Sequence, residues 1–277
     1  MMIDVHGAPL YAYTGGKAFD PTQPTVVMIH GVLNDHSVWI LQSRYLAHHG
    51  FNVLAIDLPG HGRSGGEAPA SVEAAAHAVV GLLDALGVAR AALVGHSWGS
   101  LIALQTAADA PGRVSQLALV GTAYPMRVSP ALLEASLNAP LKAIDMVNVY
   151  SHSTLAPPPS ALGPGTWLYG GSRALMRRVL ASNRAVNVFH RGFAACDGYQ
   201  GGEQAARRVR CPVLFVLGTR DQMTPPKAAQ PLIDAARGAG VAVQVVRVPA
   251  GHALMTEAPD AVLAALHGWL RQPVGVV

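Results

Sequence analysis

The chain has 277 residues, of which 51% are hydrophobic and only 13% charged, which excludes a disordered protein and favours a well-filled interior. The net charge is +4, but the basic residues form no stripe interleaved with aromatics, which argues against nucleic-acid binding. No apolar run reaches the about 18 residues of a membrane span, and the first ten residues lack a secretory-signal pattern. The two cysteines, Cys196 and Cys211, make neither a disulfide framework nor a zinc site. We therefore expect a soluble cytoplasmic protein.

Apolar runs and helical patterns alternate along most of the chain. The segments 2–5 and 9–13 can form an antiparallel pair around His6-Gly7. Continuous apolar runs, typical of strands covered on both faces, follow at 25–29, 52–58, 91–94, 116–120, 212–217 and 243–248. Helical patterns lie between them at 37–49, 72–86, 100–110 and 256–270. This alternation predicts an α/β protein with a mostly parallel, eight-stranded sheet and helices on both faces.

The stretch 124–208 interrupts this alternation. It has no strong strand pattern, is rich in proline, including the run 157–159, and contains helical patterns at 131–138 and 172–183. A region of about 85 residues is too long for a connecting loop. We therefore predict a core formed by 1–123 and 209–277, and an inserted helical cap at 124–208.

The motif Gly95-His96-Ser97-Trp98-Gly99 stands between a predicted strand and a predicted helix. In this context G-x-S-x-G predicts a nucleophile elbow, a strained turn that exposes the serine oxygen. Glycines at 95 and 99 suit a strand and a helix that nearly touch, and the first N–H groups of the helix suit a developing oxyanion. The alternative is an ordinary tight turn whose serine caps the helix.

A serine nucleophile needs a base within hydrogen-bond reach, and the base needs an orienting partner. Asp221 directly follows the apolar run 212–217, and His252 follows 243–248. Ser, then Asp, then His is the chain order of the triad that accompanies a nucleophile elbow. Asp57 also follows a predicted strand, but it precedes the elbow, so Asp221 is the better candidate.

Five segments in this order resemble the α/β-hydrolase-fold enzymes that carry a cap, over nearly the whole chain. They are HGVLNDHSVW at 30–39, DLPGHGRS at 57–64, GHSWG at 95–99, GTRDQMTP at 218–225 and GH at 251–252. The resemblance implies that Ser97 is the nucleophile, His252 the base and Asp221 its partner. It also implies an oxyanion hole formed by the backbone N–H groups of Val32 and Trp98.

The remaining histidines near these motifs are expected to be structural. His30 would hold the oxyanion loop, and His61 would lie in the turn after Pro59. The side chain of His96 would leave the elbow in another direction. Asp35 and His36 flank the oxyanion loop, where they either orient it, contact substrate or simply pack.

Within the family that the chain resembles, a serine nucleophile excludes the dehalogenase and epoxide-hydrolase branches, which use aspartate. We expect a serine hydrolase that cleaves carboxylic esters, or related thioesters or lactones, of small to medium apolar acyl groups through an acyl-enzyme. The alternatives are a carbon–carbon bond hydrolase of ring-cleavage products, a cofactor-free perhydrolase and a non-catalytic ligand-binding protein. The oxyanion loop HGVLND is less rich in glycine than is usual among the carbon–carbon hydrolases.

The predicted cap would close over Ser97 and shape the substrate pocket. Its candidate lining residues are Tyr124, Met126, Trp167, Tyr169, Phe189 and Phe193, although each could instead pack the cap onto the sheet. No dinucleotide fingerprint, phosphate loop or metal-ligand cluster is present, so the sequence implies no cofactor and no metal. The expected partner is a small-molecule substrate, with no nucleic acid and no membrane, and the protein is expected to be a monomer or homodimer.

Overall fold

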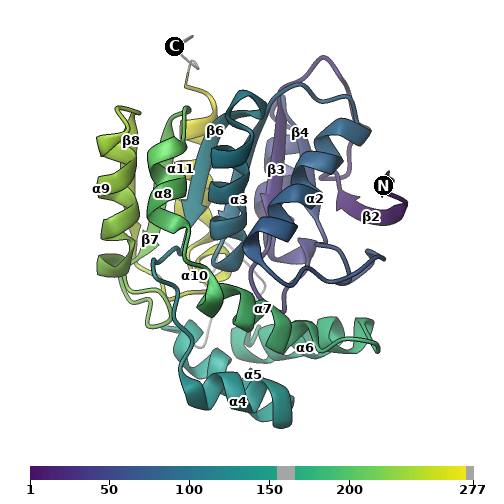
Figure 1. Cartoon of the computed structure of the whole chain (residues 1–277), viewed down its shortest axis with the longest axis vertical. Coiled ribbons are helices and arrows are strands. Elements are labelled where there is room, and N and C mark those ends of the chain that lie inside the picture. Colours follow the sequence, from purple (N-terminus) through teal and green to yellow (C-terminus); the bar gives the residue numbers. More distant parts are fainter. Residues whose placement is uncertain (155–165, 273–277) are drawn as a thin grey trace.

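The computed structural model describes residues 1–154 and 166–272. Within them, eight strands form one sheet in the order β1-β2-β4-β3-β5-β6-β7-β8. The strands are β1 (Met2–Val5), β2 (Ala8–Tyr13), β3 (Thr25–Ile29), β4 (Asn52–Ile56), β5 (Ala91–His96), β6 (Val114–Val120), β7 (Val213–Gly218) and β8 (Val243–Val248). This sheet confirms the predicted eight-stranded architecture (Figure 1).

Strand pairing brings the predicted functional loops to one edge of the sheet. β1 and β2 form the expected antiparallel pair, β2 also runs antiparallel to β4, and all the other neighbours are parallel. The register sets Ile29 at the end of β3 beside Gly95 of β5, and Gly218 of β7 beside Val248 of β8. Because parallel strands end at the same edge, the segments that follow them begin close together.

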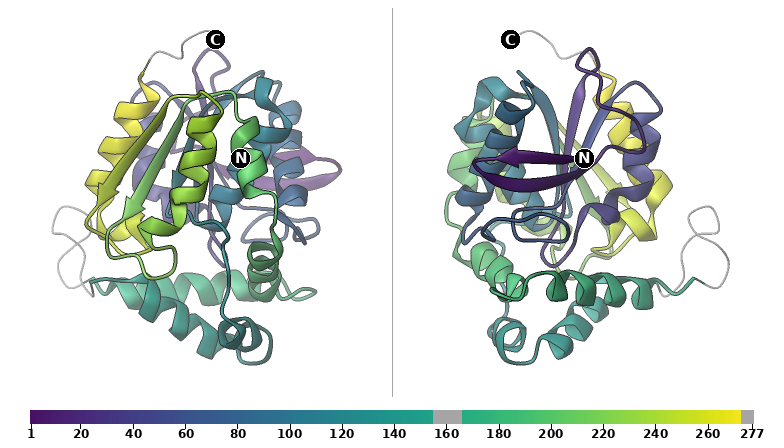
Figure 2. Two further views of the ribbon diagram at one scale, coloured as in Figure 1. Left: turned by 60° about the vertical axis from the view of Figure 1, so that its left-hand side comes forward. Right: turned by 90° about the vertical axis from the view of Figure 1, so that its right-hand side faces the viewer.

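The helices form two layers on the sheet and a third group beyond its carboxyl edge. They are η1 (His36–Trp39), α1 (Ile40–Ala47), α2 (Val72–Ala85), α3 (Trp98–Asp109), η2 (Pro111–Arg113), α4 (Pro130–Asn138), α5 (Pro140–Ser151), α6 (Leu168–Ser182), α7 (Val188–Gly198), α8 (Gly202–Arg208), η3 (Pro226–Ala229), α9 (Gln230–Gly238), α10 (Leu254–Glu257) and α11 (Pro259–Leu270). Helices α2, α3, α8 and α9 cover one face, and α1 and α11 cover the other (Figure 2).

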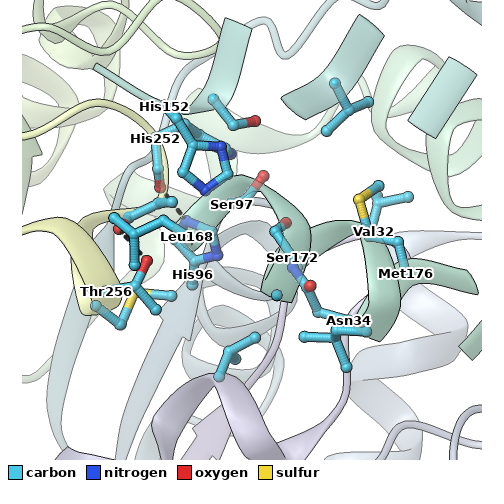
Figure 3. A pocket seen from close by; sticks show the side chains of 18 of the residues that line it. Val32, Asn34, His96, Ser97, His152, Leu168, Ser172, Met176, His252 and Thr256 are labelled. Atoms are coloured by element: carbon cyan, nitrogen blue, oxygen red, sulfur yellow. Dashed lines mark hydrogen bonds between the residues drawn. The ribbon is translucent and has the colours of Figure 1, made fainter. Parts of the chain in front are cut away.

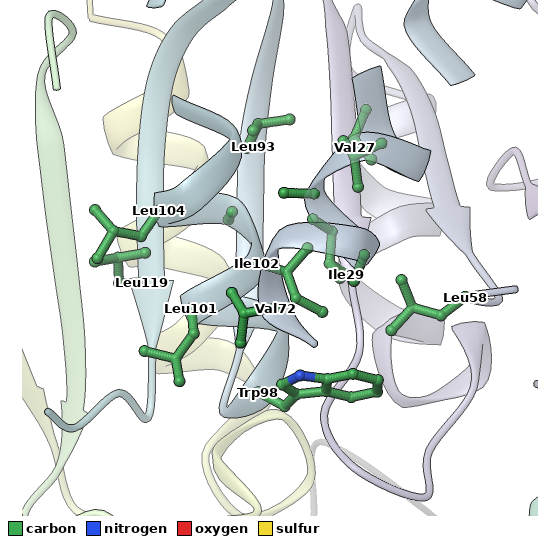
Figure 4. Close-up of a cluster of buried hydrophobic side chains, with 14 of the residues drawn as sticks. Val27, Ile29, Leu58, Val72, Leu93, Trp98, Leu101, Ile102, Leu104 and Leu119 are labelled. Atoms are coloured by element: carbon green, nitrogen blue, oxygen red, sulfur yellow. The ribbon is translucent and has the colours of Figure 1, made fainter. Parts of the chain in front are cut away.

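The strands read as continuous apolar runs because both of their faces are covered. Every residue of β3, β4, β5 and β7 is buried. On the α3 side, Val27 and Leu93 of the sheet belong to the same buried cluster as Leu101, Ile102 and Trp98 of α3 (Figure 4). Burying each such side chain stabilises the fold by roughly 1.5–3 kcal/mol, so this layer holds the elbow between β5 and α3 rigidly.

Helices α4 to α7 lie together at the end of the sheet where its parallel strands finish (Figure 1). We propose these four helices as the cap. Helix α8, which falls inside the predicted range 124–208, instead packs against α3 and α9 in the core, with Ala205 and Ala206 buried. The proposed cap therefore ends at Gly201, before α8 begins. The proline run at 157–159 lies outside the described residues.

The last predicted helix is divided in two. Ala258, with φ of −138°, separates α10 from α11, and Pro259 is the first residue of α11. Proline disfavours the helical conformation in the residue before it, which explains the break. Among the helices of 1–154 and 166–272, none has the length and apolarity needed to cross a membrane.

Candidate active site

Ser97 lies at a sharp turn between β5 and α3. Its φ of 54° and ψ of −120° place a non-glycine residue in a strained, left-handed region. A Cβ atom at Gly95 would be 2.0 Å from the carbonyl oxygen of Gly99, and one at Gly99 would be 2.4 Å from that of Ile29. Both positions therefore exclude larger residues, and the turn has the geometry of the predicted nucleophile elbow.

His252 and Asp221 meet at the carboxyl edge of the sheet. The Nδ1 atom of His252 lies 2.9 Å from Oδ2 of Asp221. An ionised carboxylate only accepts hydrogen bonds, so Nδ1 carries the proton and Nε2 is left with a lone pair. Both Ser97 and His252 line one cavity (Figure 3). The structure thus brings the three predicted residues to one place, with the imidazole in the tautomer that a general base requires.

The carboxylate of Asp221 is held by a turn of its own loop. The backbone N–H groups of Met223 and Thr224 donate to Oδ1, each at 2.8 Å, and the Thr224 hydroxyl lies 2.7 Å from Oδ2. Burial opposes ionisation, but the interaction with His252 and these hydrogen bonds outweigh it and hold the pKa of Asp221 below its usual value. Asp221 therefore stays negative at neutral pH and can stabilise a protonated His252. The sequence reasoning did not single out Thr224.

The cavity above Ser97 has a volume of about 340 Å³. The core supplies one side of the lining, including Val32, Met223 and Met255 of α10. Helices α5, α6 and α7 with their flanking residues supply much of the other side, including Leu175, Met176 and Phe193. Its surface is mostly apolar, which is typical of a small-molecule site with few orienting polar groups.

The loop after β3 carries the first candidate oxyanion donor. Val32 lines the cavity directly after Gly31, whose own position is so tight that a Cβ atom would be 3.1 Å from that of Ser97. The second candidate, Trp98, is the first residue of α3, where a backbone N–H has no acceptor inside the helix. Both candidates thus belong to segments that adjoin Ser97, and their role in an oxyanion hole stays a prediction.

A sequence model of the alpha/beta hydrolase fold matches residues 24–151. The crystal structure of an enol-lactonase from Burkholderia xenovorans superposes with a TM-score of 0.82 at 23% identity, covering 98% of this chain and 100% of that one. The chain has the α/β-hydrolase fold. An esterase from Exiguobacterium antarcticum gives a TM-score of 0.80 at 19% identity, covering 98% of this chain and 99% of that one.

A curated relative matches in sequence as well. The dihydrolipoyllysine-residue acetyltransferase component of the acetoin cleaving system of Cupriavidus necator is 33% identical over 236 residues. The match covers 82% of this α/β-hydrolase-fold chain but 59% of the relative. The chain thus spans about three fifths of that protein's length.

Of the six aromatic and methionine residues predicted to line the pocket, Trp167 and Phe193 do line this cavity. The other four are not among its lining residues, and their contacts explain why. Tyr124 donates its hydroxyl hydrogen to the carbonyl of Gln200, and Tyr169 donates to that of Asp145. The side chains of Met126 and Phe189 are buried in the core cluster.

His96 corrects one sequence expectation. Its side chain is expected to point away from the elbow, but it lines the cavity, and its Nε2 donates to the backbone carbonyl of His252 at 2.9 Å. Burial, with repulsion from His252, lowers the pKa of His96 to about 3, so its imidazole is neutral. His96 therefore acts as a fixed donor that holds the loop of the proposed base.

Glu257 links the loop that carries His252 to the proposed cap by hydrogen bonds. Its buried carboxylate accepts hydrogen bonds from the backbone N–H groups of Gly251 at 3.2 Å and Ser153 at 3.0 Å, and from the Ser153 hydroxyl. Ser151 adds a further link because its carbonyl accepts from the N–H of Ala253 at 3.0 Å. The end of α5 is thus joined to the histidine loop at Gly251 and at Ala253, the residues directly before and after His252.

His30 bridges the oxyanion loop and the turn after β4. Its Nδ1 donates to the Gly31 carbonyl at 2.8 Å, and its Nε2 accepts from the Leu58 N–H at 3.1 Å. Burial lowers its pKa, so the imidazole is neutral and both bonds can form together. His61 lies in the predicted turn, with Nδ1 3.0 Å from the carbonyl of Pro59.

Asp57 does not serve as the acid partner of His252, because its carboxylate oxygens bind other groups. Its Oδ1 accepts from both the backbone N–H and Nδ1 of His36, each at 2.7 Å, and its Oδ2 accepts from the Arg63 N–H at 2.9 Å. Asp35 in turn accepts from Arg178 of α6 at 2.7 Å. Asp35, His36 and Asp57 have ligand atoms within 4.8 Å of one another, but these bonds already engage them. We therefore assign them a structural role.

The Asp57 carboxylate should stabilise the fold at neutral pH. Burial opposes its ionisation, but the hydrogen bonds from His36 and Arg63 outweigh burial and hold its pKa below the usual value. A group with a depressed native pKa adds stability above its unfolded pKa of about 3.9, and this stability is lost as the pH falls through the native pKa. Asp57→Asn should therefore lower the unfolding free energy at pH 7 by roughly 1–3 kcal/mol.

This loss of unfolding free energy is measured by thermal and urea unfolding of wild type and Asp57→Asn between about pH 7 and 3. The difference in unfolding free energy should stay constant down to about pH 4 and narrow only below it. A difference that widens as the pH falls from about 7 to 4 would mean that the native pKa of Asp57 is raised, contrary to the prediction, because a raised native pKa adds stability to wild type on protonation.

Proposed function

We propose that the protein is a serine hydrolase that cleaves carboxylic esters, or related thioesters or lactones, through an acyl-enzyme. The observation that carries this proposal is the His252–Asp221 hydrogen bond of 2.9 Å beside a strained Ser97 in the same cavity. An unstrained, helix-capping serine would need neither the buried acid–imidazole pair nor the cavity. Esterase and lactonase structures with the same fold are consistent with this chemistry.

The proposed reaction begins when Oγ of Ser97 attacks the carbonyl carbon while its proton passes to Nε2 of His252. The N–H groups of Val32 and Trp98 stabilise the oxyanion, and each such donor is typically worth about 3–4 kcal/mol in the transition state. Collapse breaks the bond to the leaving oxygen, which receives the proton from His252. Water then attacks the acyl-enzyme, giving its proton to His252, and the acid is released with Ser97 regenerated.

The apolar walls favour a mainly apolar acyl group. Val32, Val147, Leu175, Met176 and Phe193 all contribute to them. A cavity of about 340 Å³ is at the lower end of the range for small-molecule sites, which fits a small to medium acyl chain.

A substrate screen tests the proposed activity. Wild type and Ser97→Ala are compared on an ester, a thioester, a lactone and a dienone, with a fluorophosphonate probe to label a reactive serine. We expect ester hydrolysis and probe labelling in wild type and neither in the variant. Dienone cleavage without ester cleavage would support the carbon–carbon hydrolase, and probe labelling or ligand capture without turnover would support a binding protein.

Substitution of Phe193 should change the acyl-chain preference. This side chain lines the cavity and is only 6% exposed, so Phe193→Ala enlarges the pocket and should shift the preferred ester toward longer acyl chains. Trp167→Ala should also shift the profile, because Trp167 lines the cavity. It should lower the free energy of unfolding less than Phe193→Ala does, because Trp167 is 58% exposed. The measurement is kcat/KM for p-nitrophenyl esters of increasing chain length.

Phe189→Ala is the matched control, because Phe189 is fully buried in the core cluster and does not line the cavity. It should lower the unfolding free energy by about 3–5 kcal/mol and leave the chain-length profile unchanged. A profile that is the same in wild type, Phe193→Ala and Trp167→Ala would place the acyl site elsewhere.

A further inference from the structure

His152 is a second imidazole in the cavity, and the proposed reaction does not use it. It directly follows α5 and lines the same cavity as Ser97 (Figure 3). Its Nδ1 lies 3.1 Å from the carbonyl oxygen of Asn148. A carbonyl only accepts, so Nδ1 carries the proton, and the lone pair of the neutral imidazole is on Nε2.

The surroundings keep this imidazole neutral. Burial lowers the pKa of His152, although the Asn148 carbonyl and the charge of Glu257 act in the opposite direction. Across the ring lies Tyr169, with ring centroids 5.9 Å apart, and its hydroxyl already donates to Asp145. Within 1–154 and 166–272, no group donates to Nε2 of His152. The cavity therefore contains an acceptor that a bound substrate can use.

The position of His152 indicates which part of a substrate it meets. Its two neighbours, Ser151 and Ser153, are bonded to Ala253 and Glu257, so His152 is fixed beside the loop of His252. Val32 and Met176 lie on the other side of Ser97 (Figure 3). In the proposed reaction His252 gives its proton to the leaving oxygen, so groups on its side of Ser97 face the leaving alcohol.

We infer that Nε2 of His152 accepts a hydrogen bond from the leaving alcohol, so that the preferred substrates are monoesters of diols and similar alcohols with a second donor. This inference rests on the proposed esterase function. A hydroxyl a few bonds from the ester oxygen supplies the donor, whereas an alkyl group of the same size excludes water from Nε2 of the half-buried His152 and gives no hydrogen bond in return. That loss penalises the alkyl ester. The chemical step is unchanged, because His152 binds the alcohol and transfers no proton.

The test uses two esters of equal size. Values of kcat/KM are measured for 2-hydroxyethyl butanoate and n-propyl butanoate, and their ratio is compared between wild type and His152→Phe. The wild-type ratio should exceed that of the variant by roughly tenfold, which corresponds to one buried hydrogen bond. The n-propyl ester should react no more slowly with His152→Phe than with wild type, because the variant has no imidazole nitrogen that this ester leaves without a partner, and the loss should fall on the 2-hydroxyethyl ester. His152→Gln, which retains an acceptor oxygen, should keep part of the ratio.

The variants also separate recognition from a purely structural role. His77→Phe, at an exposed histidine of α2 that does not line the cavity, is the matched control and should leave the ratio unchanged. If His152 only caps α5, His152→Phe will lower the melting temperature with the same ratio as wild type, which overturns the inference. His152→Leu serves the same comparison if the phenylalanine variant does not fold. Failure of wild type to hydrolyse either ester would overturn the proposed function and this inference together, whereas hydrolysis with equal ratios overturns the inference alone.

Discussion

Ser97→Ala should lower kcat for ester hydrolysis by about 10⁴- to 10⁶-fold while leaving the fold intact. The variant removes the atom that forms the acyl-enzyme, and the position remains small enough for the turn between β5 and α3. Steady-state hydrolysis of p-nitrophenyl butanoate measures the loss, and thermal unfolding verifies the fold. A rate close to that of wild type would eliminate Ser97 as the nucleophile.

The other proposed triad members should behave as parts of one unit. His252→Ala and Asp221→Asn should each lower kcat by orders of magnitude, and the double variant of Ser97 and His252 should be little worse than the worse single variant. Asp109→Asn is a matched control, because Asp109 is an aspartate at the end of α3 that binds Arg208 and does not line the cavity. Its kcat should equal that of wild type, and independent, additive losses in the triad variants would contradict a shared mechanism.

Gly99→Val should lower the unfolding free energy by at least about 3 kcal/mol and abolish activity as well. A Cβ atom at Gly99 would be 2.4 Å from the Ile29 carbonyl oxygen and 2.6 Å from that of His30. Both are backbone atoms at the end of β3, so relief requires α3 to move away from the sheet. That movement would displace the oxyanion loop, which begins there.

Gly112→Val supplies the control for this prediction, because nothing lies within 4 Å of a Cβ atom built at Gly112. Urea unfolding should show nearly wild-type stability for this variant and a large loss for Gly99→Val. Equal stability of the two variants would show that the strand and the helix are not held at the distance that the structure gives.

The fold could be predicted because the pattern that identifies each strand or helix lies within a short segment of the sequence. Apolar runs such as 25–29 and 91–94 are continuous since both faces of a central parallel sheet are buried. The positions of Ser97, Asp221 and His252 could also be anticipated, because parallel strands deliver the loops that follow them to one edge. Their proximity is seen in the structure, and their catalytic roles are our proposal.

The cavity walls could not be predicted, since they depend on how the cap helices face the core. A helical pattern identifies an apolar face but not the surface that this face meets. Phe189 and Phe193 are one turn apart on α7, yet only Phe193 lines the cavity. Sequence reasoning missed His152, which directly follows α5, because no motif encodes where the end of that helix meets the core. It also missed Thr224, although this residue lies within the quoted segment 218–225, because its bonds to Asp221 depend on how that loop turns.

The hydrogen bonds of Glu257 determine which part of the proposed cap can be exchanged in a chimeric protein. Glu257 accepts hydrogen bonds from both Ser153 and Gly251. The residues that directly follow α5 are therefore held against the loop that carries His252, although they belong by sequence to the inserted region. A chimera that imports a foreign cap should therefore take its new helices in place of α6 and α7 and keep the native chain through Ser153. Exchanging the chain from α5 through Ser153 as well would remove Ser153, a partner of Glu257, and the Ser151 carbonyl that accepts from Ala253. The loop that carries His252 would then lose its supports on the cap side.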